Sequence, residues 1–173
     1  MSITAHWYAI RTRSRAEKVV RDQLIARQIE PLLPLMSRVS QWKDRKKVVE
    51  WPLFPGYCFA KFMTDQKLIV LQTPGLVEIV SGVRGPEPIP EDEIMSVMRV
   101  VQSRVSHVPW AYFSDGALVE VIRGPLQGLR GSFVRQAHGS RLVIRVNLIQ
   151  QATAVEIEAD DVAPIKALAE AAS

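Results

Sequence analysis

Four short apolar stretches in the last third of the chain lie close together and are separated by turn-forming residues. They cover Leu118–Ile122, Gly131–Gln136, Leu142–Leu148 and Ala154–Glu158. Glycine and proline, which favour tight turns, lie between them, as at Gly124-Pro125 and Gly139. Strands this short and this closely spaced, within about 50 residues, indicate a small all-β barrel.

The preceding part of the chain mixes strand and helix patterns. Bulky and polar residues alternate over Trp7–Thr12, which predicts a strand. A helix to about Ile29 should follow, because Ser14 can cap it and Glu17, three residues later, completes a capping box. The residues on its apolar face are Ala16, Val20 and Leu24. Pro31 ends the helical pattern and suits an edge strand.

Later elements complete this mixed pattern. The basic residues Lys43–Lys47 lie between two apolar-rich arms, which predicts the exposed tip of a long hairpin. Cys58–Met63 reads as a strand, and a helix begins near Glu91, where its dipole favours carboxylates. The core-facing residues expected on that helix are Ile94, Val97, Met98 and Val101. The order of elements predicts an α+β domain, a small and mostly antiparallel sheet covered by helices.

We therefore expect two domains. The α+β domain covers residues 1–104 and the barrel covers residues 114–165. Periodicity lapses around Pro109, so residues 105–113 are interpreted as a linker. The Ala-rich residues 166–173 are expected to form a flexible tail.

Charge is distributed unevenly between these parts. Residues 1–50 contain eleven Lys or Arg and five Asp or Glu, whereas the rest of the chain carries a slight acidic excess. A basic N-terminal region suggests contact with a polyanion such as DNA or RNA. A solvated helix face and a basic loop would produce the same asymmetry, and the sequence does not decide between the two.

The sequence lacks the residues that several classes of functional site require. Cys58 is the only cysteine, so neither an intrachain disulfide nor a zinc site of several thiolates can form. The three histidines have no metal-ligand spacing, and Gly124–Gly131 lacks the Gly-Lys-Ser/Thr ending of a phosphate loop. We therefore expect no catalytic residues, no metal and no cofactor. No apolar run approaches the roughly 18 residues of a membrane span, and the first residues lack a signal-peptide pattern, so a cytoplasmic location is expected.

Two N-terminal segments and one C-terminal segment resemble a known family. Trp7-Tyr8-Ala9-Ile10-Arg11-Thr12 and Pro52-Leu53-Phe54-Pro55-Gly56-Tyr57-Cys58-Phe59 are similar to the N-terminal domain of NusG/RfaH-type transcription factors. Asp115–Gly131 is similar to the KOW motif that follows in that family. The resemblance implies an N-terminal domain that binds RNA polymerase, then an SH3-like KOW barrel. Such a protein is a monomer that controls transcription elongation and antitermination, not an enzyme.

One stretch of the barrel points to a branch of the family. Asn147-Leu148-Ile149 is followed by Gln150 and Gln151, where general NusG factors carry an aromatic residue and then Gly-Arg. This departure resembles the specialised RfaH-like and UpxY-type antiterminators of long operons, and it puts Rho recruitment in doubt. A general NusG-type factor and a KOW-containing module that binds the ribosome or RNA remain alternatives.

The resemblance also implies site residues. The aromatic residues implied to contact the clamp helices of the polymerase's large subunit are Tyr8, Phe54, Tyr57 and Phe59. Flanking prolines should stiffen this segment into an exposed aromatic ledge. Alternatively, Phe54 and Phe59 fill the core, and Tyr8 could belong to either the core or the interface.

The basic residues implied to contact the non-template DNA strand of the transcription bubble are Arg11, Arg13, Arg15, Lys18 and Arg21. Those on the hairpin that would contact upstream duplex are Arg45, Lys46 and Lys47. In the barrel, Asn147, Leu148 and Ile149 form the edge implied to bind a small-subunit ribosomal protein, although Ile149 could equally be core.

Overall fold

The computed structural model of the chain describes residues 4–112 and 116–165. The chain divides into two compact units, Met1–Glu91 and Asp92–Ser173. The first unit combines a small sheet, two helices and a long hairpin, and the second unit contains a six-stranded sheet and one helix. The tail that we expected over 166–173 lies outside the described residues.

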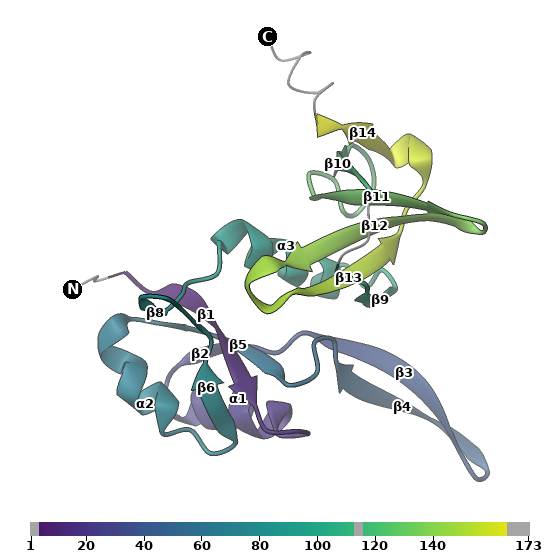
Figure 1. Cartoon of the computed structure of the whole chain (residues 1–173). Coiled ribbons are helices and arrows are strands. Elements are labelled where there is room, and N and C mark those ends of the chain that lie inside the picture. Colours follow the sequence, from purple (N-terminus) through teal and green to yellow (C-terminus); the bar gives the residue numbers. More distant parts are fainter. Residues whose placement is uncertain (1–3, 113–115, 166–173) are drawn as a thin grey trace. The chain divides into compact units, whose positions relative to one another are not determined.

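A four-stranded antiparallel sheet lies at the centre of the first unit, with strand order β2-β5-β1-β6 (Figure 1). Its strands are β1 (His6–Thr12), β2 (Glu30–Leu32), β5 (Tyr57–Phe62) and β6 (Leu76–Ile79). The edge strand β2 carries Pro31, which has no N–H to donate to a second neighbour. The expected first strand and the edge position of Pro31 are therefore confirmed.

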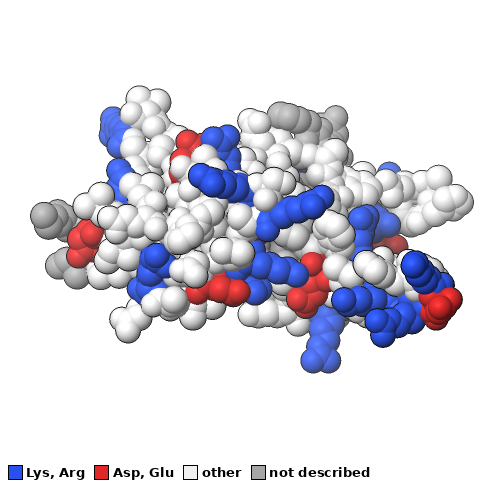
Figure 2. Space-filling view, turned by 90° about the horizontal axis from the view of Figure 1, so that it is seen from below, with Lys and Arg blue, Asp and Glu red and all other residues white. Residues whose placement is uncertain are grey.

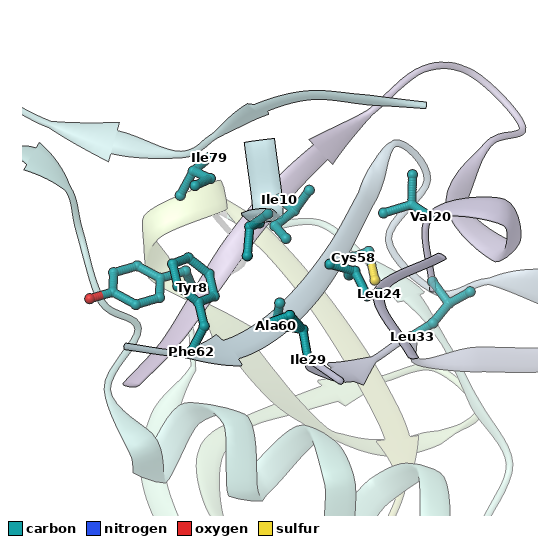
Figure 3. Packing of buried hydrophobic residues seen from close by; sticks show 11 residues of the cluster. Tyr8, Ile10, Val20, Leu24, Ile29, Leu33, Cys58, Ala60, Phe62 and Ile79 are labelled. Carbon is teal, nitrogen blue, oxygen red and sulfur yellow. The ribbon is translucent and has the colours of Figure 1, made fainter. Parts of the chain in front are cut away.

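One face of this sheet is covered by helices α1 (Glu17–Ala26) and α2 (Lys67–Leu71), the latter preceded by a 3-10 turn, η1 (Thr64–Gln66). The helices contribute Val20, Leu24 and Val70 to a buried apolar cluster. The sheet residues in this cluster are Tyr8, Ile10, Cys58, Ala60, Phe62 and Ile79 (Figure 3). The rings of Tyr8 and Phe62 stack with their centroids 4.5 Å apart. This cluster is the core of the first unit.

The start of α1 differs from the expected one. Its N-cap is Ala16, and no side chain caps it, so the capping box expected from Ser14 and Glu17 is wrong. Glu17 is buried instead, and its Oε1 accepts a hydrogen bond from the backbone N–H of Gly56 at 2.8 Å. A partner 39 residues away in sequence has replaced the local one.

The end of α1 is also earlier than expected, and a hydrogen-bonded cap explains why. The N–H of Gln28 donates to the carbonyl of Ile25, and that of Ile29 donates to the carbonyl of Leu24, both at 3.0 Å. This is the Schellman pattern, with Gln28 in the left-handed region at φ 61°. The side chains of Ile29 and Leu24 both join the buried cluster, so packing favours this end.

A long hairpin extends from the sheet of the first unit (Figure 1). Strands β3 (Leu35–Trp42) and β4 (Arg45–Pro52) pair over their whole length, and Lys43-Asp44 forms the turn. The expected exposed tip is confirmed, although Arg45, Lys46 and Lys47 belong to β4 and not to the turn. A second, two-residue pair joins β7 (Ser81–Gly82) to β8 (Gly85–Pro86).

The second unit contains a six-stranded antiparallel sheet with order β14-β10-β11-β12-β13-β9. Its strands are β9 (His107–Trp110), β10 (Ala117–Val121), β11 (Arg130–Gln136), β12 (Gly139–Val146), β13 (Gln151–Glu156) and β14 (Val162–Pro164), with 3-10 turns η2 (Asn147–Ile149) and η3 (Ala159–Asp161). Val143, Ala152 and Ala154 form its buried cluster, against which Trp110 and Val134 pack. The α+β architecture of the first part and the all-β, KOW-type architecture of the second are confirmed.

Strand β9 lies inside the segment that we expected to be a linker. It pairs with β13 from His107 opposite Val155 to Trp110 opposite Ala152. Pro109 suppresses the strand pattern in the sequence, but β9 is an edge strand, where a missing N–H is tolerated. The Thr153 hydroxyl donates to the carbonyl of Val108 at 2.9 Å and fixes this pairing.

Helix α3 (Glu91–Gln102) belongs, except for its first residue, to the second unit, whereas we expected it in the first domain. Its buried residues are Ile94, Val97 and Val100, so the register differs from the expected one at its C-terminal end. Arg99 donates to the carbonyl of Gln127 at 2.7 Å, which ties the helix to the barrel of the same unit.

Candidate functional site

The four-stranded sheet carries apolar side chains on both faces. Because side chains alternate along a strand, Trp7, Ala9 and Phe59 point away from the face that α1 and α2 cover. Ala9 lies directly opposite Phe59, and Arg11 lies opposite Tyr57 on this same second face. The expected polymerase-binding aromatics are thus divided between two faces, because Tyr8 belongs to the helix-covered one.

The expected aromatic ledge is mostly buried. Tyr8 is 7% exposed, Phe54 1% and Phe59 0%. The exposed ledge is therefore wrong for Phe54 and Phe59, which agree with the core alternative, and Tyr8, for which both were open, is buried. Phe54 and Phe59 meet edge to face, with ring centroids 6.1 Å apart at 88°. Tyr57 keeps part of its surface accessible. Alternation in the sequence shows which residues share a face of the sheet, but it does not show which face meets solvent.

The segment between the hairpin and β5 is held by contacts to distant parts of the first unit. Gly56 adopts φ 85°, a conformation that favours glycine, and its carbonyl accepts from the Thr12 N–H at 2.8 Å. Its N–H donates to Glu17 Oε1. Both backbone groups of Gly56 are therefore satisfied by β1 and α1, and this anchoring positions Tyr57 at the entrance of β5.

The basic residues expected to contact nucleic acid differ in whether they already form an ion pair within the protein. Arg11 pairs with Glu78 at 3.1 Å, and Arg21 pairs with its neighbour Asp22 at 3.0 Å. Among the expected residues, the exposed ones that no ion pair between described residues occupies are Arg13, Arg15, Lys18, Arg45, Lys46 and Lys47. Figure 2 shows Lys and Arg side chains gathered at the right of the view, where the hairpin lies.

A hollow at the base of the hairpin brings part of this basic set next to an aromatic residue. Its volume is about 400 Å³, and it is lined by Ser14, Arg15, Glu17, Lys18, Trp51, Pro52 and Pro55. The Lys18 Nζ donates to the carbonyl of Glu50 at 3.0 Å, which connects α1 to β4. Trp51, 52% exposed, was not among the expected site residues. Its proximity to Arg15 and Lys18 depends on the hairpin register, which the sequence does not show.

The expected partner-binding edge of the barrel forms the turn η2. Asn147 is exposed, Leu148 is half-buried and Ile149 is buried, which agrees with Ile149 as a core residue. Glu93 of α3 accepts from the Asn147 backbone N–H at 3.1 Å and from its side-chain amide at 2.5 Å. Gln150 follows in the left-handed region at φ 51°.

The one cysteine of the chain lies in the buried core of the first unit. Burial raises the pKa of the Cys58 thiol from 9.0 to about 12, so this cysteine is a poor nucleophile. Among residues 4–112 and 116–165, no cluster of three or more His, Cys, Asp or Glu has the arrangement of a metal site. Within the same described ranges, no helix has the length and apolar character needed to cross a membrane.

Comparison with known proteins assigns a family to these features. Residues 5–98, more than half of the chain, match the family model described as transcription termination factor NusG. Transcription termination/antitermination protein NusG of Helicobacter pylori is 25% identical over 164 residues, covering 87% of this chain and 93% of the relative. Its counterpart from Chlamydia pneumoniae is 30% identical over 131 residues, covering 73% and 71%.

A solved structure supports the same fold. The structure described as domain interaction in Thermotoga maritima NusG aligns with a TM-score of 0.55 at 21% identity, covering 94% of this chain and 98% of that one. With the matched family model, the mixed first unit and the KOW-type second unit, the chain belongs to the NusG family of transcription termination and antitermination proteins.

Proposed function

We propose that this protein is a transcription elongation and antitermination factor that binds the clamp helices of RNA polymerase and favours the closed, elongating state. It acts in the cytoplasm as a monomeric binding protein and not as an enzyme. Antitermination then results from differential affinity, because a factor that binds the closed clamp better than the open clamp shifts the equilibrium toward elongation.

The observation that carries the proposal is the second apolar face of the four-stranded sheet. A small sheet needs one apolar face to pack against its own helices, and α1 and α2 cover that face here. Trp7, Ala9 and Phe59 make the other face apolar too. An aromatic-rich face of this kind suits a helical partner, because large rings bury much area with little loss of rotamer entropy.

Access to this face differs between its residues. Tyr57 has accessible surface at the entrance of β5 and is proposed as the first contact. Phe54 and Phe59 are buried in the free chain, as are Trp7 and Ala9, so this face must become accessible before it can touch the polymerase. Binding through them therefore requires a conformational change. Tyr8, stacked on Phe62 on the other face, is proposed to support the sheet rather than to contact the partner directly.

The free basic residues are proposed to contact the DNA of the elongation complex. Arg13, Arg15 and Lys18 lie where β1 leads into α1 and would pair with phosphates of the non-template strand. The hairpin residues Arg45, Lys46 and Lys47 would contact nucleic acid further upstream. Arg11 and Arg21 would have to exchange their carboxylate partners for phosphates, so we expect smaller contributions from them.

The barrel is proposed to recruit a small-subunit ribosomal protein through Asn147 and Leu148, with Ile149 supporting their turn from the core. The replacement of the general Gly-Arg pattern by Gln150-Gln151 supports a specialised, operon-specific role. Chromatin occupancy of the protein tests this part: we expect signal at one or a few long operons, and signal over all transcribed genes would favour a general factor.

The polymerase contact is tested at Tyr57. Replacing Tyr57 with Asp places a charge where an aromatic anchor should be desolvated, and we expect loss of co-purification with core polymerase. Tyr57→Phe keeps the ring and should retain binding. Thermal unfolding of both variants checks that they fold. If the folded Tyr57→Asp variant co-purifies like the unchanged chain, Tyr57 does not belong to the interface.

A further inference from the structure

The register of the β3–β4 hairpin divides its side chains into two different faces. Residues directly opposite each other share a face, and the pairs alternate along the hairpin. One face contains the pairs Met36–Trp51, Arg38–Val49, Ser40–Lys47 and Trp42–Arg45. The other contains Leu35–Pro52, Ser37–Glu50, Val39–Val48 and Gln41–Lys46. We call the first the tryptophan face, because both tryptophans of the hairpin lie on it.

The tryptophan face combines aromatic rings with cations. Trp42 is 63% exposed and Trp51 is 52% exposed. Arg38 and Lys47 lie between them in the register and Arg45 lies opposite Trp42. All three are exposed, and the face carries no carboxylate. The opposite face has Glu50 and exposed valines, with Lys46 as its one cation. The positive charge of the hairpin strands is therefore concentrated on the face that has the rings.

Both tryptophans are more than half exposed, and neither ring stacks on another aromatic ring among the described residues. Neither of the cation–π contacts found among the described residues involves Trp42 or Trp51, and neither ring belongs to a buried cluster. Leaving such large apolar rings in water does not stabilise the fold, because burial is what makes an aromatic side chain stabilising. Exposed tryptophans interleaved with arginine and lysine are instead the composition of a stacking surface for unpaired bases.

The distance between the two tryptophans matches a short stretch of single-stranded nucleic acid. Trp51 pairs with Met36, which is six residues from Trp42, so the two rings are separated by about 20 Å along the hairpin at about 3.3 Å per residue. This is about six nucleotides at the stacked spacing of about 3.4 Å. At the base of the hairpin, Trp51 also lines the hollow that contains Arg15 and Lys18, so the cationic surface continues onto α1.

We infer that the tryptophan face of the β3–β4 hairpin binds single-stranded nucleic acid by stacking bases on Trp42 and Trp51 and by pairing phosphates with Arg38, Arg45 and Lys47. A duplex fits this surface less well, because its bases are already stacked and only its phosphates would be available. The inference replaces the duplex contact expected of the hairpin, and it removes Lys46 from the contact because the register places that residue on the opposite face. It does not depend on polymerase binding. Single-stranded DNA and RNA share the chemistry, and the experiment distinguishes them.

The test uses the full chain without polymerase and measures fluorescence anisotropy of a labelled oligonucleotide of about ten nucleotides, as single-stranded DNA, single-stranded RNA and duplex DNA. We expect the single strands to bind more tightly than the duplex and to quench tryptophan fluorescence. Trp42→Ala and Trp51→Ala should each weaken single-strand binding about tenfold, whereas Trp42→Phe keeps a ring and should lose less. Whichever single strand binds more tightly, DNA or RNA, is identified as the ligand of the hairpin.

Neighbouring lysines provide the matched control. Lys47→Ala removes a charge from the tryptophan face, and Lys46→Ala removes the same charge from the opposite face. We expect Lys47→Ala to weaken binding more and to lower the slope of log affinity against log salt by about 0.7 for each phosphate that the variant no longer neutralises. Equal effects of the two lysines, tighter binding of the duplex, unchanged affinity of the tryptophan variants, or no binding would each overturn the inference. None of these outcomes touches the polymerase proposal, which Tyr57→Asp tests separately.

Discussion

The four-stranded sheet and the β3–β4 hairpin are both antiparallel β-structure in the same unit, but their side chains have opposite environments. In β1 and β5 most residues are buried, and Tyr8, Ile10 and Phe62 pack in one cluster. In the hairpin, most of β3 and β4 is exposed, including two tryptophans. The contrast indicates that packing determines the residues of the sheet, whereas those of the hairpin are available for a partner. The same substitution should therefore affect stability in one region and binding in the other.

The largest expected effect is the loss of stability when a buried ring of the sheet is removed. Phe62→Ala removes a fully buried ring stacked on Tyr8 and should lower the free energy of unfolding by about 3 to 5 kcal/mol. Trp42→Ala on the hairpin should lower it by less than about 1 kcal/mol, because the ring is exposed. Urea denaturation of both variants gives the two values, and similar losses would contradict the contrast.

The buried thiol provides a second comparison. Because burial raises the pKa of Cys58 to about 12, the folded chain keeps its thiol protonated where the unfolded chain would not. The stability associated with this group is fully present below about pH 9 and declines as pH rises toward 12. A thiol reagent at pH 8 should label Cys58 only slowly. In a Cys58→Ala background, Val48→Cys on the exposed hairpin should react at the rate of a free thiol, and equal rates would show that β5 opens readily.

A smaller effect concerns the contact that anchors the hairpin exit to the helix. Glu17→Ala removes the acceptor of the Gly56 N–H and should destabilise the chain by about 1 to 3 kcal/mol. Glu17→Gln retains an acceptor oxygen at the same place and should cost less. Urea denaturation of the two variants gives their losses of unfolding free energy. A smaller loss in Glu17→Gln supports the hydrogen bond, whereas equal losses would assign the effect to the charge of Glu17.

The smallest expected effect is a gain in stability at the end of α1, in the packed region. Gln28 ends α1 in the left-handed conformation, so Gln28→Gly should relieve backbone strain and raise stability by up to about 1 kcal/mol. Gln23→Gly, inside the same helix, should instead destabilise it by about 1 kcal/mol. Thermal unfolding of both variants measures this difference, and a destabilising Gln28→Gly would argue against the Schellman end.

Local patterns were sufficient for most of the architecture. The alternation over Trp7–Thr12 predicted β1, and the turn residues around Gly139 predicted the strands of the barrel, because both signals act over a few residues. Strand β9 was missed because Pro109 is unfavourable in most strands and is tolerated here only by its edge position. Whether a strand is at an edge is a property of the whole sheet, which local patterns do not contain.

The candidate site was less predictable for the same reason. Glu17 had a plausible local role as a capping-box residue, but its partner is Gly56, far away in the sequence. For Phe54 and Phe59 both an exposed ledge and a core position were open, and they are buried. The sequence did not decide because aromatic residues next to prolines occur in cores and on surfaces alike. The tryptophan face becomes visible only once the hairpin register places Trp42 and Trp51 on the same side.

The most direct test of the central claim is site-specific photo-crosslinking in a reconstituted elongation complex. A photoreactive phenylalanine analogue at position 57 lies at the entrance of β5, and the same analogue at position 68 lies on the exposed surface of α2. The proposal predicts a crosslink from Tyr57 to the large polymerase subunit that carries the clamp helices, and none from Leu68. Crosslinking from Leu68 alone, or from neither position in a complex that contains the protein, would contradict it.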